Sequence, residues 1–146
     1  MPLYSVNRTS AALSTSNDTL TIQASSTKPL RVYIIDLKGM GTASAANEVL
    51  AARSTGGTTG GGAVTPSKMN SNSGAASFVV YTTWSAQPTL SDVLWRFGVN
   101  ANGGIDKFVA IPGAEIQVPV GGQLSIRSAS GTSNVAVNVL VEEVDG

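Results

Sequence analysis

The sequence predicts an all-β fold, a jelly-roll-like β-sandwich of about eight strands with an extended N-terminal arm. Short runs of alternating apolar and polar residues recur along the chain, turn signals rich in glycine, proline and asparagine separate them, and no heptad or amphipathic helical pattern is present. This spacing is typical of sandwiches, jelly rolls and barrels. The jelly roll is preferred because eight strands in two four-stranded sheets fit 146 residues and leave room for one long connection.

The N-terminal segment, residues 1–18, is predicted to be an extended arm. Its apolar side chains are scattered among serine and threonine and have no evident core role, so its partner is expected to be another protein surface. The contact residues predicted in the arm are Leu3, Tyr4, Val6 and Arg8. Residues 19–146 are predicted to form one sandwich domain, since a chain of this length can bury about 70% of its unfolded surface.

The strands of this domain follow from period-two patterns. The run 30–37 is apolar on both faces, which indicates a central strand. The run 135–142 alternates most regularly and pairs with 123–128 in a predicted hairpin. Pro119 places the run 115–120 at an edge or a bulge. The remaining predicted strands are 19–24, 78–84, 93–99 and 107–111.

Two segments are less regular. In 43–53, alanine, glutamate and leucine favour a helix, but the β surroundings favour a strand, with a short helical turn as the alternative. Residues 55–77 are rich in glycine, serine and threonine and are predicted to form a long loop. A loop of this length in a compact domain is usually functional or mobile.

Two glycine motifs resemble nucleotide-binding signatures. Gly39 and Gly41 follow an apolar strand, but Ser44 replaces the third glycine and no acidic residue lies about 20 positions further on. The run 56–62 lacks the Gly-Lys-Ser/Thr ending of a phosphate loop. No cofactor is therefore predicted.

The composition also limits the catalytic and metal-binding chemistry that can be expected of the chain. The chain has no histidine and no cysteine, which removes the commonest general base and thiolate chemistry. Isolated aspartates such as Asp18, Asp92 and Asp106 are assigned to turn hydrogen bonding rather than to a calcium site. The consecutive Glu142 and Glu143 point to opposite faces of a strand and do not form a catalytic pair. The sequence thus predicts neither an enzyme nor a metal site.

Charge and hydropathy indicate which classes of partner the chain is expected to have. Nine basic and nine acidic residues leave no net charge, so no nucleic-acid footprint is predicted. No apolar stretch reaches the length of about 20 residues needed to cross a bilayer, and residues 1–5 lack signal-peptide character. A surface this poor in charge favours lateral contact with neighbouring subunits.

The aromatic residues Tyr81, Trp95, Phe97 and Phe108 lie in predicted strands and are expected to pack in the core. Trp84 is the exception, because it lies at a strand end beside a turn. A ring in this position could bind a sugar or anchor a neighbouring subunit, and Trp84 is therefore a further predicted contact residue.

The whole pattern resembles the capsid cement or decoration proteins of tailed bacteriophages. The features that carry the resemblance are the segment 1–10, the Ser/Thr/Gly-rich strands, the segment 56–61 and the end 127–135. The similarity covers nearly the whole length of the chain. It lies in the general composition and strand pattern, and no short motif in it is diagnostic. It implies a β-rich structural protein on the outer surface of the virion, made in the host cytoplasm, that assembles as a homotrimer and clamps neighbouring major capsid proteins.

Two other function classes remain open. A receptor- or carbohydrate-binding module of a tail or head fibre would share the fold and use Trp84 and the 55–77 loop. An enzyme would have to work with carboxylates, lysine or tyrosine alone.

Overall fold

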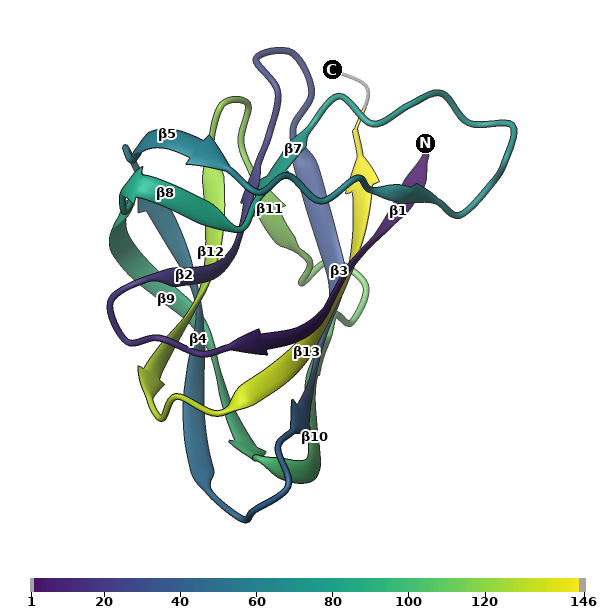
Figure 1. The fold of residues 1–146 in the computed structure, drawn as a ribbon. Coiled ribbons are helices and arrows are strands. Elements are labelled where there is room, and N and C mark those ends of the chain that lie inside the picture. Colours follow the sequence, from purple (N-terminus) through teal and green to yellow (C-terminus); the bar gives the residue numbers. More distant parts are fainter. Residues whose placement is uncertain (1, 145–146) are drawn as a thin grey trace.

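The computed structural model describes residues 2–144, which form two packed β-sheets and a small third sheet (Figure 1). The described residues contain no helix, which confirms the predicted all-β class. The strands are β1 (Leu3–Ala12), β2 (Asp18–Gln23), β3 (Leu30–Met40), β4 (Ala46–Thr55), β5 (Thr58–Gly61), β6 (Ser67–Lys68), β7 (Val79–Tyr81), β8 (Thr83–Ala86), β9 (Thr89–Asn100), β10 (Asn102–Val109), β11 (Ile116–Val118), β12 (Gln123–Ser130) and β13 (Asn134–Glu143).

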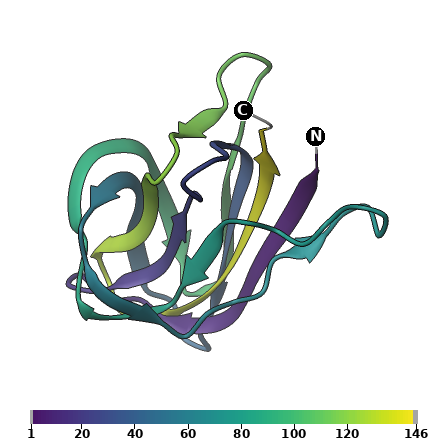
Figure 2. The same cartoon turned by 90° about the horizontal axis from the view of Figure 1, so that it is seen from above.

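The strand order is that of a jelly roll. The six-stranded sheet runs β10-β3-β13-β1-β6, with β11 also on β3, and the five-stranded sheet runs β7-β2-β12-β4-β9. Four antiparallel pairs are nested in the chain: β1 with β13, β2 with β12, β3 with β10 and β4 with β9. These eight strands match the predicted number, and Figure 2 shows the layers from above. The other five strands have four residues or fewer.

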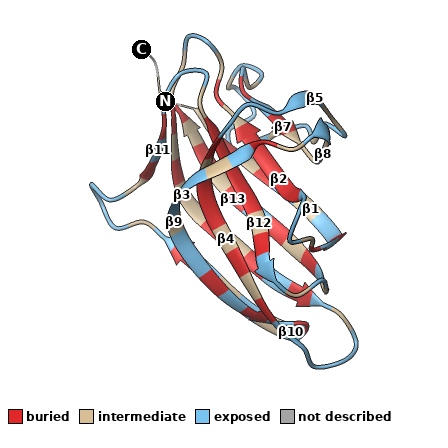
Figure 3. Cartoon of the chain, turned by 90° about the vertical axis from the view of Figure 1, so that its left-hand side faces the viewer, coloured by how far each residue is buried: buried red, intermediate tan, exposed pale blue. Residues whose placement is uncertain are grey.

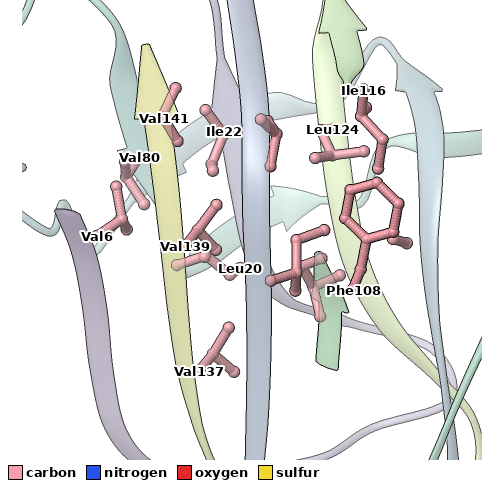
Figure 4. Close-up of a cluster of buried hydrophobic side chains, with 14 of the residues drawn as sticks. Val6, Leu20, Ile22, Val80, Phe108, Ile116, Leu124, Val137, Val139 and Val141 are labelled. Atoms are coloured by element: carbon pink, nitrogen blue, oxygen red, sulfur yellow. The ribbon is translucent and has the colours of Figure 1, made fainter. Parts of the chain in front are cut away.

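The core lies between the two sheets because their inward faces carry the apolar halves of the alternating patterns. In β13, the valines at 135, 137, 139 and 141 are at most 1% exposed. Figure 4 shows three of these valines beside Leu20 and Ile22 of the opposite sheet, and Leu124 of that sheet near Ile116 and Phe108. Full burial of each such side chain contributes about 1.5–3 kcal/mol to the stability of the folded state.

The prediction of an extended N-terminal arm is wrong for Leu3–Ala12, because these residues form β1. This strand is built into the six-stranded sheet between β13 and β6, with Leu3 paired to Glu142 and Val6 to Val139. The apolar residues at positions 4, 6, 11 and 13 face the core and are at most 3% exposed. Residue 1 of the predicted arm and residues 145–146 of the predicted domain lie outside the described residues.

The two ambiguous segments have different outcomes. The segment 43–53 contains strand β4 and no helical turn, as the β surroundings predicted. The predicted 55–77 loop is interrupted by β5 and by the two-residue β6. Strands β5 and β8 form a two-stranded sheet, here called the flap.

Only one of the two long sides of the sandwich is covered by chain. Residues 62–81 carry β6, which pairs with β1, and β7, which pairs with β2, and Phe78 packs edge-on against Tyr4 with ring centroids 5.5 Å apart. On the opposite side, β9 and β10 end the two sheets and are connected through Ala101.

Candidate interaction surface

The predicted N-terminal contact residues make their contacts within the molecule itself. Tyr4 is 1% exposed and donates a hydrogen bond from Oη to the Gly74 carbonyl (2.9 Å), and Val6 is fully buried. The Arg8 guanidinium donates to the Thr19 carbonyl, and burial lowers the pKa of Arg8 from its ordinary value. Tyr4 and Val6 are therefore unable to dock on another protein while the sandwich is folded, and their prediction as contact residues was wrong. Leu3 is half-buried at the start of β1.

Trp84 holds the flap onto the outer face of the five-stranded sheet. Its Nε1 donates to Thr21 Oγ1 (3.0 Å), and its ring lies against Tyr81 with centroids 4.8 Å apart. Gly57 has a φ of +87°, and a Cβ at this position would lie 2.7 Å from the indole ring. Glycine is therefore required both by the left-handed backbone and by the close approach of the ring. A role for Trp84 toward another subunit stays a prediction.

A buried polar layer lies between the flap and this sheet. Asp18 accepts hydrogen bonds from Thr21 Oγ1 and Ser125 Oγ, both at 2.5 Å, and from Arg127 Nε at 2.7 Å. Gln123 donates from Nε2 to the Gly56 carbonyl at 2.9 Å. These contacts explain why polar residues on the outward face of β2 and β12 are buried, which their alternation alone does not reveal.

A half-open depression of about 490 Å³ lies between β11 and the start of β3. Leu30 and Val118 line it, together with two arginines. Arg31 forms an ion pair with Glu142, with Nη1 and Oε2 3.8 Å apart. Arg53 donates a hydrogen bond from Nη1 to the Gln117 carbonyl at 2.7 Å. Both guanidinium groups thus have partners within the chain.

The uncovered side of the sandwich carries most of the exposed apolar side chains. Of the nine large hydrophobic residues that are exposed within residues 2–144, five lie on β9, on β10 or directly after β10. They are Val93 (39% exposed), Trp95 (44%), Ile105 (64%), Val109 (54%) and Ile111 (71%). Together they are called the β9–β10 surface, which is an edge of the sandwich and not one flat patch: Ile105 and Val109 lie on the outer face of the six-stranded sheet, whereas Trp95 packs on Phe108 between the sheets. Figure 3 shows β9 as a largely pale blue strand at the edge of the buried sheet.

Trp95 lies where β9 and β10 meet, at the centre of this edge. Its ring packs edge-on against Phe108 of β10, with centroids 5.1 Å apart and an interplanar angle of 63°. Phe108 is thereby 8% exposed, whereas Trp95 itself is open to solvent and borders a shallow depression with Val93 and Arg96. Nearer the turn, Gly98 N donates to Asp106 Oδ2 at 3.0 Å. Side-chain contacts therefore hold β9 and β10 together here.

Sequence reasoning missed this surface for an identifiable reason. Val93, Trp95, Phe97 and Val99 occupy alternate positions, which predicts one buried face, and Phe97 and Val99 are indeed buried. Two bulges in the pairing of β9 with β4 disturb the register before Trp95, and the strand there lies at the sheet edge. The only signal in the sequence is the uninterrupted apolar run 108–111, which falls at the end of an edge strand.

No group of three or more His, Cys, Asp or Glu side chains within residues 2–144 is arranged to hold a metal ion. In the same part of the chain, no helical segment has the length and apolarity of a membrane span. Comparison of the chain with protein-family models, with curated proteins and with solved structures finds no match.

Proposed function

We propose that the chain is a non-enzymatic structural protein of a phage virion, a decoration protein that binds the outer surface of the head as a homotrimer and clamps neighbouring major capsid subunits. The observation that carries the proposal is the β9–β10 surface, an uncovered apolar side on an otherwise well-packed domain. Exposed apolar patches of this kind mark sites of protein association.

Two properties of the chain support this role. Jelly rolls occur among viral capsid and lectin domains, an argument by fold analogy. Charged residues make up only 12% of the chain and balance to zero, so close lateral packing of many copies meets no net repulsion. Repetition on a symmetric shell then turns weak single contacts into strong overall binding.

The test is co-sedimentation with purified heads assembled from the major capsid protein encoded in the same genome. We expect the chain to pellet with the heads, to saturate at a fixed ratio to the capsid protein, and to raise the temperature at which the heads break. The chain alone, centrifuged under the same conditions, is the control. Absence of saturable binding would overturn the proposal.

The alternative function, a carbohydrate- or receptor-binding module, rests on the aromatic pair Tyr81 and Trp84 of β7 and β8. Both rings are half-buried, so one edge of the pair reaches the surface. Saturable binding on a glycan array that is lost in Trp84→Ala but kept in Trp95→Ala would favour this alternative over the decoration role.

A further inference from the structure

We propose that the half-open depression between β11 and the start of β3 is a binding site for a carboxylate that is joined to a compact apolar group. Arg53 binds the carboxylate, and the buried residues Leu30 and Val118 contact the apolar group. The inference goes beyond the proposed function, because it requires neither a phage head nor a second copy of the chain.

Arg53 is a charged residue on the core-facing side of β4. It pairs with Leu124 of β12, and two positions earlier Ala51 pairs with Ile126. These three partners and neighbours are at most 1% exposed and belong to the core. Residues directly opposite each other in a sheet, and residues two positions apart in a strand, share one face. The Arg53 side chain therefore projects into the space between the two sheets, near the end of β4.

The guanidinium of Arg53 has a hydrogen bond to the protein but no acidic partner within residues 2–144. Its Nη1 donates to the Gln117 carbonyl of β11 (2.7 Å), so the side chain reaches from the five-stranded sheet to the six-stranded sheet. This acceptor is uncharged and occupies one of the five N–H donors of a guanidinium. The ion pairs in this part of the chain involve other cations. A charge on a core-facing row without a counter-ion is unfavourable, and a bound anion would offset this cost.

The neighbouring carboxylates do not supply that counter-ion. Within residues 2–144, the acidic residues closest in sequence to the lining of the depression are Glu115, Glu142 and Glu143. Each already accepts a hydrogen bond from another residue. Glu142 is also paired with Arg31, the second arginine of the lining. The positive charge of Arg53 is therefore left for a ligand.

The rest of the lining suits the apolar part of such a ligand. Leu30 and Val118 pair with each other across β3 and β11 and are each 1% exposed, so they form a firmly packed floor. Pro29, Pro119 and Val144 complete the apolar lining. The volume of about 490 Å³ lies within the range of small-molecule sites, about 300–1,000 Å³, which combine apolar walls with a few polar groups.

The polar groups favour a carboxylate over a phosphate. A guanidinium presents a planar fork of donors that matches the two oxygens of a carboxylate. A phosphate carries more charge and more oxygens, and the N-terminus of a helix is a ready-made site for it. Residues 2–144 contain no helix. One guanidinium without an acidic partner, beside an apolar floor, therefore matches a single carboxylate.

The first experiment follows the NMR signals of the isotope-labelled chain during titration with isocaproate, a carboxylate on a branched aliphatic chain. We expect saturable shifts at Leu30 and Val118 and at the Nε–H of Arg53. The neutral isocaproamide has nearly the same shape and is the control. It should bind about ten-fold more weakly or not at all, because it lacks the charge that Arg53 recognises. This comparison uses the unmodified chain and does not depend on the folding of a variant.

The second experiment replaces Arg53 by methionine, which keeps an unbranched apolar stem without the charge. Arg53→Met should lower the affinity for isocaproate about ten-fold or more. Arg96→Met is the matched control, because Arg96 is 61% exposed, is paired with Glu48 and does not line the depression. Its affinity for isocaproate should be unchanged. Circular dichroism establishes that both variants are folded.

A peptide distinguishes two sources of the carboxylate. The N-acetylated tripeptide Ala-Ala-Leu ends in a carboxylate beside a leucine side chain, and its C-terminal amide is the control. Tighter binding of the peptide than of isocaproate, lost on amidation, would assign the site to the C-terminus of a polypeptide. Tighter binding of isocaproate would assign it to a free small acid. Either result supports the inference.

Three outcomes would overturn the inference. The first is the absence of shifts at the depression with both isocaproate and the peptide. The second is equal binding of isocaproate and isocaproamide, and the third is binding of isocaproate that survives Arg53→Met. In the last two cases Arg53 would not be the group that recognises the ligand. None of these results bears on the decoration role, which co-sedimentation with heads tests separately.

Discussion

Asp18 shows at the level of one residue how the outer face of the five-stranded sheet is buried. Its carboxylate is covered and accepts hydrogen bonds from Thr21, Ser125 and Arg127. From the sequence, Asp18 was predicted to serve turn hydrogen bonding, because it stands alone near a turn. Its partners Ser125 and Arg127 lie more than 100 positions away, so no local pattern predicts them.

We predict that Asp18→Ala lowers the free energy of unfolding by about 3–5 kcal/mol, because it leaves the guanidinium of Arg127 without its carboxylate in a site that is largely closed to solvent. Glu48→Ala removes the Arg96 pair, whose side chains are 61% and 44% exposed, and should cost less than about 1 kcal/mol. Urea unfolding followed by circular dichroism measures both. Equal losses in the two variants would contradict the assignment of Asp18 as a buried anchor.

Tyr33 gives a prediction for alkaline pH. Its Oη donates to Glu142 Oε2 at 2.5 Å, and this hydrogen bond is the main cause that raises the pKa of Tyr33 above its ordinary value of 10.0. Since the folded pKa is the higher one, the stabilising contribution is complete below pH 10 and is lost as the pH rises through the folded pKa. Tyr33→Phe should therefore lack the corresponding loss of stability above pH 10.

Absorbance at 295 nm provides the measurement for Tyr33. The difference between the titration curves of the unmodified chain and Tyr33→Phe isolates the ionisation of this phenol. We expect its midpoint above pH 10, and a midpoint at or below pH 10 would show that the bond to Glu142 does not form in solution.

At the scale of elements, β3 depends on a glycine where another segment crosses it. A Cβ on Gly39 would lie 2.6 Å from the carbonyl oxygen of Ala101 and closer still to that of Asn100. Both atoms belong to backbone and have little freedom to move. The glycine motif that resembled a nucleotide-binding signature is thus explained in part by packing between β3 and the β9–β10 turn.

We predict that Gly39→Ala destabilises the fold by about 3 kcal/mol, the cost of overpacking against rigid atoms. The matched control is Gly98→Ala in the edge strand β9, where a Cβ would meet nothing within 4 Å and the change should stay within about 0.5 kcal/mol. Thermal unfolding of the two variants compares them directly. A control that unfolds as early as Gly39→Ala would show that glycine is needed for strand flexibility rather than for space.

The sequence predicted those elements whose patterns are regular and missed those that depend on distant partners. Strand β13 and the hairpin with β12 follow from alternation alone, and the β surroundings correctly decided the segment that became β4. Strand β1 was missed because its apolar residues are interrupted by Arg8 and Thr9, and its partner β13 lies at the other end of the chain. Trp84 was singled out correctly as unusual, but its bond to Thr21 depends on how the flap folds over the sheet.

At the scale of the whole molecule, the nested strand pairs make folding a long-range problem. The innermost of these four pairs, β4 with β9, joins residues about 35 to 55 positions apart, whereas the outermost pair joins Leu3 to Glu142. Chains dominated by distant contacts fold slowly, because loop closure must precede the contacts that stabilise it. We predict that refolding from urea, followed by tryptophan fluorescence, takes milliseconds to seconds or longer, and a phase that completes in microseconds would contradict the nested topology.

The pairing of the first and last strands also fixes where the two ends of the described chain emerge. Glu143 N donates to the Pro2 carbonyl at 3.1 Å, and Figure 1 places both ends opposite to the β9–β10 turn. A short linker could therefore join them in a circular permutant, reopened near Asn72 in the exposed connection between β6 and β7. A peptide fused at either end would be displayed at the same pole of the sandwich, remote from the β9–β10 turn.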